Sequence, residues 1–129
     1  MHSAELLALE LSVLLFIAHL AAQNFFARAE FDDEYLMSAR DENRRVKGIK
    51  AGRAHRALAN FVENYAPFVA LDLGLIATGQ TGGWGAMIWV IGRICYLPAY
   101  ILGIPVVRSL FWVVSIIGLL MMLARLAGF

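Results

Sequence analysis

The charged residues of this 129-residue chain are concentrated in one segment, which separates long apolar stretches. Residues 6–27 carry one formal charge and residues 94–129 carry two, whereas residues 28–56 carry eight Lys or Arg and six Asp or Glu. A helix needs about 20 predominantly apolar residues to cross a bilayer. The pattern therefore predicts several membrane-spanning segments and one charged loop.

The composition excludes an ordinary soluble domain. The chain is 60% hydrophobic and 16% charged, and small soluble domains bury too little surface to hide such an excess. Its net charge of +1 provides no basic field for a nucleic acid, so we expect no nucleic-acid partner. Because Cys95 is the single cysteine, an intramolecular disulfide and a multi-cysteine metal site are excluded, and we expect no metal.

We predict an all-α membrane protein that forms a four-helix bundle as a single domain, residues 1–129. Backbone polar groups inside lipid must be satisfied within the segment, so the spans are helices. The third and fourth spans are separated by the sequence Gly103-Ile104-Pro105. The predicted spans are residues 5–27, 53–79, 84–102 and 106–127, with a charged loop at residues 28–52.

Lys and Arg gather around the first loop and are absent from the turn between the second and third spans. By the positive-inside rule, this loop is cytoplasmic and both chain ends lie on the far side. A signal peptide is the competing interpretation of the first span, but that span lacks a positive leading segment and its apolar run is too long. Trp84 and Trp89 are expected in an aromatic belt at the membrane interface.

Two helical stripes carry polar residues that lipid would not tolerate. On the second span, Arg53, Arg56, Asn60 and Glu63 are spaced at i, i+3, i+7 and i+10, within an arc of about 80°. On the third span, Arg93, Tyr96 and Tyr100 share another stripe. Guanidinium groups hold carboxylates in bidentate geometry, and a carboxylate holds an amine. A guanidinium or hydroxyl near a bound thiol also stabilises the nucleophilic thiolate. The stripes predict a small ligand with both carboxylates and an amine.

A purely structural interpretation of the stripes stands beside this one. Polar residues in membrane helices also join helices together, and Arg93 would then simply neutralise Glu63. Glu10 and His19 face opposite sides of the first span, so each is interpreted as a packing or interhelical hydrogen-bonding residue. Asp72 points away from Glu63 and belongs to neither stripe.

The segment RAHRALANFVENYAPF resembles the signature of the membrane-associated proteins in eicosanoid and glutathione metabolism, the MAPEG family. The family pattern of Arg, Asn and an acid on the second helix is matched by Arg56, Asn60 and Glu63. The pattern on the third helix is matched by Arg93, Tyr96 and Tyr100. A later Arg that is tied to the thiol in several members is best matched by Arg108, which Ser109 follows, and an Arg at the end of the first helix by Arg28. Some members have Tyr directly after the acid, where this chain has Asn64, with Tyr65 one position later.

The resemblance implies a left-handed four-helix bundle that assembles as a homotrimer, with glutathione between subunits near the cytoplasmic side. Arg108, aided by Tyr100, would stabilise the glutathione thiolate. The implied glutathione contacts are Arg56, Asn60, Glu63, Tyr96 and Tyr100. To these we add residues that share or flank the same stripes, or match the family at the end of the first helix: Arg28, Arg53, His55 and Arg93.

We therefore expect a glutathione transferase, with possible peroxidase activity, that uses glutathione as co-substrate and takes a lipophilic second substrate from the bilayer. The expected location is a bacterial inner membrane, with the endoplasmic-reticulum membrane as the alternative. One alternative is a non-catalytic lipid-binding or scaffold protein of the same fold. Another is a small multidrug exporter with Glu10 as its membrane carboxylate, although such exporters have shorter loops.

Overall fold

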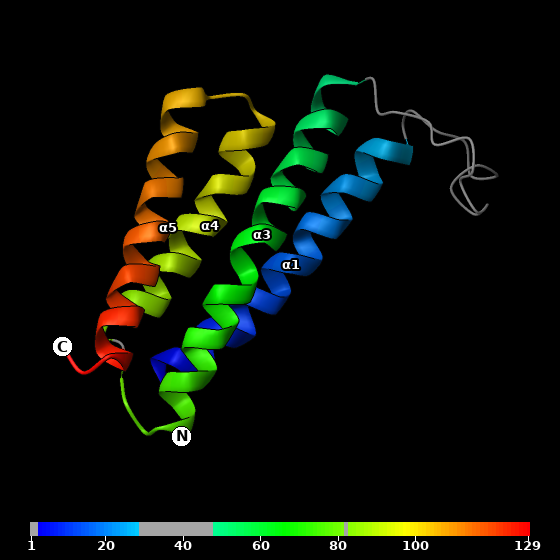
Figure 1. Ribbon diagram of the computed structural model, residues 1–129. Helices are drawn as coiled ribbons and strands as arrows, with labels where there is room; N and C mark the ends of the chain where they lie inside the picture. Colours follow the sequence, from blue (N-terminus) through cyan, green and yellow to red (C-terminus); the bar gives the residue numbers. More distant parts are fainter. Residues whose placement is uncertain (1–2, 29–47, 82) are drawn as a thin grey trace.

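The computed structural model describes residues 3–28, 48–81 and 83–129, and this part of the chain is built from α-helices. The helices are α1 (Ala4–Arg28), α3 (Ile49–Ala77), α4 (Gly85–Ile101) and α5 (Pro105–Leu126). Figure 1 shows them side by side, with α1 against α3 and α4 against α5, in an up-and-down arrangement. Over the described residues, the predicted all-α fold with four helices is confirmed. Most of the predicted charged loop, residues 29–47, lies outside them.

Two of the described helices, α1 and α5, are long and apolar enough to cross a membrane. Helix α4 is also apolar but has 17 residues. Helix α3 begins at Ile49, four residues before the predicted start of its span, and its first turns carry the basic residues Lys50, Arg53 and Arg56. The charged start of α3 therefore lies at the end of the bundle where α4 connects to α5 (Figure 1).

The core is a set of aromatic rings shared by three helices. Phe61 and Phe68 of α3 are fully buried, as is Trp89 of α4. The Trp89 ring stacks on Phe68 with 3.9 Å between centroids and 8° between planes, and Phe16 of α1 approaches Phe61 at 6.0 Å. Stacked aromatic pairs add favourable energy beyond the area that they bury.

This packing corrects one prediction. Trp84 is 73% exposed, as expected for a residue of an interfacial belt, but Trp89 is 0% exposed and lies in the protein core. The sequence places Trp89 one turn into a helix, and hydropathy alone does not distinguish the lipid-facing side of such a helix from its protein-facing side.

Helices α4 and α5 approach each other through glycines. A Cβ atom built on Gly118 would lie 2.6 Å from the Gly85 carbonyl oxygen, and one built on Gly92 would lie 3.1 Å from the Phe111 oxygen. Small residues allow such close backbone contact between membrane helices. The connection is short, because Gly103 takes a left-handed conformation (φ 74°) and Pro105 begins α5.

Candidate functional site

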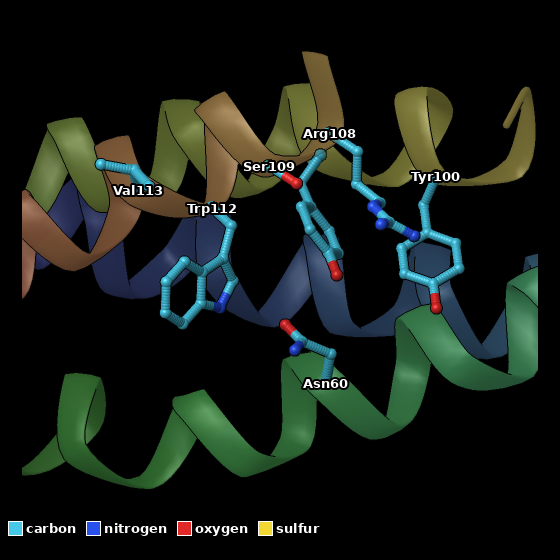
Figure 2. Close-up of a pocket in the computed structure, with 7 residues that line it drawn as sticks. Asn60, Tyr100, Arg108, Ser109, Trp112 and Val113 are labelled. Atoms are coloured by element: carbon cyan, nitrogen blue, oxygen red, sulfur yellow. The ribbon is translucent and has the colours of Figure 1, made fainter. Parts of the chain in front are cut away.

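A cavity of about 470 Å³ lies where α3 faces α4 and α5. Figure 2 shows Asn60 on α3 pointing across this space toward side chains of the other two helices. One part of the wall is polar, whereas Trp112 and Val113 provide an apolar part. The complete lining is Asn60, Tyr96, Tyr100, Arg108, Ser109, Trp112 and Val113.

The fold brings Arg108 of α5 to Tyr100 of α4. The short connection turns the chain back, so the first turn of α5 lies beside the last turn of α4. The guanidinium carbon of Arg108 lies 4.9 Å from the centroid of the Tyr100 ring, within the range of a cation–π interaction. The Tyr100 ring in turn packs edge-on against Tyr96, with centroids 5.5 Å apart. These three predicted site residues therefore form one cluster on the cavity wall.

Arg93 lies behind this wall rather than on it. Its side chain is 0% exposed, and its Nη1 donates a hydrogen bond of 2.7 Å to Oδ1 of Asn60. The guanidinium carbon also lies 4.3 Å from the Tyr96 ring centroid and 5.4 Å from that of Phe61. The pairing of Arg93 with Glu63 is wrong, because Arg93 bonds to Asn60 and Glu63 is exposed on α3. The bond to Asn60 nevertheless joins α4 to α3, as the structural interpretation of the stripes expects.

The remaining predicted contacts lie outside the cavity lining, and all of them except Glu63 lie at one end of the bundle. Figure 1 shows that the end of α1, the start of α3 and the α4–α5 connection share this end. Arg53 donates from Nη1 to the carbonyl oxygen of Ile101 at 3.1 Å. His55 is exposed, with its Nδ1 3.3 Å from Nε2 of Gln23 on α1. The other exposed residues of this group are Arg28, Arg56 and Glu63.

The structure shows what Asn64 contacts at the position where some family members have tyrosine. Its Nδ2 donates to the backbone oxygen of Asn60 at 2.8 Å and approaches Oδ1 of Asn60 at 3.4 Å. Tyr65 does not take over the place of the missing tyrosine, because its hydroxyl lies 3.0 Å from Oγ of Ser12 on α1. The Tyr65 ring belongs to the aromatic core, stacked on Phe16 at 5.9 Å.

Trp112 and Val113 were not predicted as lining residues. The sequence feature that could have identified them is their spacing from Arg108. Trp112 and Val113 follow it by four and five residues, and such positions share one face of a helix. Both residues are apolar and lie in a long apolar span. Composition therefore gave no reason to separate them from lipid-facing neighbours.

Other buried polar groups lie outside the cavity. His19 is fully buried, its Nδ1 donates to the Leu15 carbonyl oxygen at 2.9 Å, and its ring stacks on Phe61 at 4.5 Å. Its interpretation as a packing residue is confirmed. Asp72 is also fully buried, and its two carboxylate oxygens have no hydrogen-bond partner among the described residues. Neither group contributes to the lining of the cavity.

A family model described as the MAPEG family matches residues 6–128. Neither the curated proteins nor the solved structures gave a match.

Proposed function

The chain belongs to the MAPEG family, and from this premise we propose that it is a glutathione-dependent membrane enzyme. Members of this family include glutathione transferases, and the apolar helices α1 and α5 agree with a membrane protein. In the proposed reaction the glutathione thiolate attacks an electrophilic carbon of a lipophilic substrate and displaces a leaving group. In the peroxidase variant, two glutathione molecules reduce a lipid hydroperoxide to the alcohol and water, forming glutathione disulfide.

The observation that carries the proposal is the position of Arg108 in a cavity that also contains Asn60, Tyr96 and Tyr100. The volume of about 470 Å³ falls in the range of small-molecule sites, about 300–1,000 Å³. A fixed guanidinium favours a thiolate over a thiol, and the thiolate is the nucleophile. Arg108, aided by Tyr100, is therefore our candidate for thiol activation.

Glutathione also carries two carboxylates and one amine, which need partners of opposite charge. We assign Arg28, Arg53, His55, Arg56 and Glu63 to these groups. The first four lie at the end of the bundle nearest the cavity, and Glu63 lies about one turn from Asn60 on α3. Four of the five are exposed on the subunit. We therefore propose a homotrimer in which a neighbouring subunit completes each site.

The second substrate is proposed to enter from the bilayer along α5. This helix exposes apolar side chains such as Leu110, Val114 and Ile117, and its Trp112 and Val113 line the cavity. A lipophilic acceptor would reach the thiol without crossing water. We propose a bacterial inner membrane as the location. The distribution of Lys and Arg supports an orientation with residues 28–52 on the cytoplasmic side, where glutathione is present.

The proposal is tested by measuring conjugation of an aryl halide to glutathione by the purified protein in detergent. We expect Arg108→Ala to lower kcat/KM about 100-fold or more, the scale seen when one charge-stabilising donor is removed from an active site. Arg125→Ala is the matched control, since Arg125 is exposed near the other end of α5. Unchanged turnover of Arg108→Ala would remove Arg108 from the mechanism. Absence of glutathione binding in calorimetry would favour the non-catalytic scaffold.

A further inference from the structure

The amide of Asn60 has a fixed orientation. Arg93 has N–H donors and no acceptor, so the atom of Asn60 that faces its Nη1 at 2.7 Å must be the oxygen. The Nδ2 group of Asn64 approaches the same oxygen at 3.4 Å. Rotating the amide by 180° would set N–H groups against N–H groups. The Nδ2 group of Asn60 is consequently the part of this side chain that remains for a ligand.

Arg93 itself does not line the cavity. It is 0% exposed and packed between the rings of Tyr96 and Phe61, and its Nε and Nη2 atoms have no hydrogen-bond partner among the described residues. Burying a guanidinium with unsatisfied donors is costly, and an ionisable residue inside a membrane bundle is usually functional. Phe61 belongs to the aromatic core, whereas the other two partners of Arg93, Asn60 and Tyr96, are residues of the cavity wall.

We propose that Arg93 is a positioning residue that holds Asn60 as a hydrogen-bond donor toward the cavity, rather than a direct contact of the ligand. With Asn60 held in this way, its amide N–H and the Arg108 guanidinium both offer donors to the same space. The cavity then selects a group that accepts hydrogen bonds and carries negative charge, such as a thiolate or a carboxylate. The identity of that ligand as glutathione rests on the proposed function.

Asn60→Asp separates this role from a structural one. Aspartate has nearly the same shape and keeps an oxygen toward Arg93, where the hydrogen bond becomes charge-assisted and stronger. Toward the cavity it replaces a donor by a second acceptor oxygen. We expect a melting temperature equal to or above that of the wild type, and a glutathione affinity at least 10-fold weaker in calorimetry. An unchanged affinity would overturn the inference, as would an affinity loss that merely accompanies a lower melting temperature.

A double-mutant cycle tests whether Arg93 affects glutathione binding by holding Asn60 in place. Arg93→Met keeps a long side chain but removes the donors, so we expect glutathione to bind about 10-fold more weakly. Arg93→Lys, which retains one charged donor, should recover part of that loss. In the Asn60→Ala background, Arg93→Met should cause little further loss, because coupled residues are non-additive. An equal further loss would show that Arg93 acts without Asn60 and would overturn the inference.

The two proposals fail in different ways. A wild-type protein that binds no glutathione overturns the proposed function and, with it, the ligand assigned here. A wild-type protein that binds glutathione, with an Asn60→Asp variant that binds it equally well, overturns the role of Arg93 alone. If Arg93→Met does not fold, Asn60→Asp and Arg93→Lys decide the matter, since both keep the contact between the two helices.

Discussion

Arg53 joins α3 to the end of α4 by a contact that depends on a glycine. Its Nη1 donates to the Ile101 carbonyl oxygen at 3.1 Å, and carbonyl groups in the last turn of a helix lack intrahelical partners. The Arg53 guanidinium lies over Gly103, where a Cβ atom would be 2.5 Å from its central carbon. Gly103 thus permits both the left-handed turn and the approach of Arg53.

Gly103→Ala is expected to destabilise the protein more than Gly79→Ala. Both glycines have a left-handed φ, 74° and 68°, so both substitutions carry a backbone cost of about 1–2 kcal/mol. A Cβ atom on Gly79 meets nothing within 4 Å, whereas one on Gly103 collides with Arg53. Thermal unfolding in detergent measures the difference. Equal melting temperatures for the two variants would show that the Arg53 contact contributes no stability.

Periodicity correctly predicted that polar residues share faces of α3 and α4, but it did not predict their neighbours. Asn60 and Glu63 belong to one predicted stripe, yet Asn60 lines the cavity and Glu63 is exposed. The bond between Arg93 and Asn60 depends on how α3 and α4 are set against each other. A single sequence shows which face a residue occupies, while its partner is decided by the relative placement of two helices.

At the scale of the elements, the sequence predicted the positions of the helices along the chain but not the way they pack against one another. Long apolar stretches and the Gly103 to Pro105 break indicated where the helices lie, because both signals are local. The burial of Trp89 and the approach of Gly118 to Gly85 were not foreseen, since they require the α4–α5 interface to be known. This interface places Arg108 beside Tyr100, so the site depends on the packing of this helix pair.

Gly118→Ala is expected to destabilise the helix pair by about 1–3 kcal/mol, the range for overpacking a well-packed interior. Its Cβ atom would lie 2.6 Å from the Gly85 oxygen and 2.7 Å from the Trp89 nitrogen, and both are backbone atoms that cannot move alone. Gly74→Ala is the control, because its Cβ atom would meet the flexible end of Leu126 at 3.1 Å. Circular dichroism during heating compares the two variants. A Gly118→Ala variant as stable as Gly74→Ala would contradict this account of the interface.

At the scale of the whole molecule, a single chain does not bring all the proposed site residues into one cavity. The cavity residues Asn60, Tyr100 and Arg108 lie together, whereas Arg56 and Glu63 are exposed. Lipid is a poor solvent for exposed arginine and glutamate within a bundle, and such residues usually face protein or a water-filled cavity. In the proposed homotrimer, each of these exposed groups would face the cavity of a neighbouring subunit.

Mixed trimers test this arrangement. Glu63→Ala and Arg108→Ala are each expected to abolish most conjugation activity when expressed alone. If Glu63 and Arg108 act from different subunits, co-expression should restore part of it, because about one interface in four of a randomly mixed closed ring combines an intact Glu63 with an intact Arg108. The control is co-expression of Arg108→Ala with Tyr100→Phe. Arg108 and Tyr100 contact each other within one chain. If both act in the same site, every chain in this mixture carries one damaged residue, and mixing restores no activity. Recovery in the first pair and not in the second supports a shared site. No recovery in either pair would place Glu63 and Arg108 in the same subunit's site, and the exposed position of Glu63 would then require another explanation.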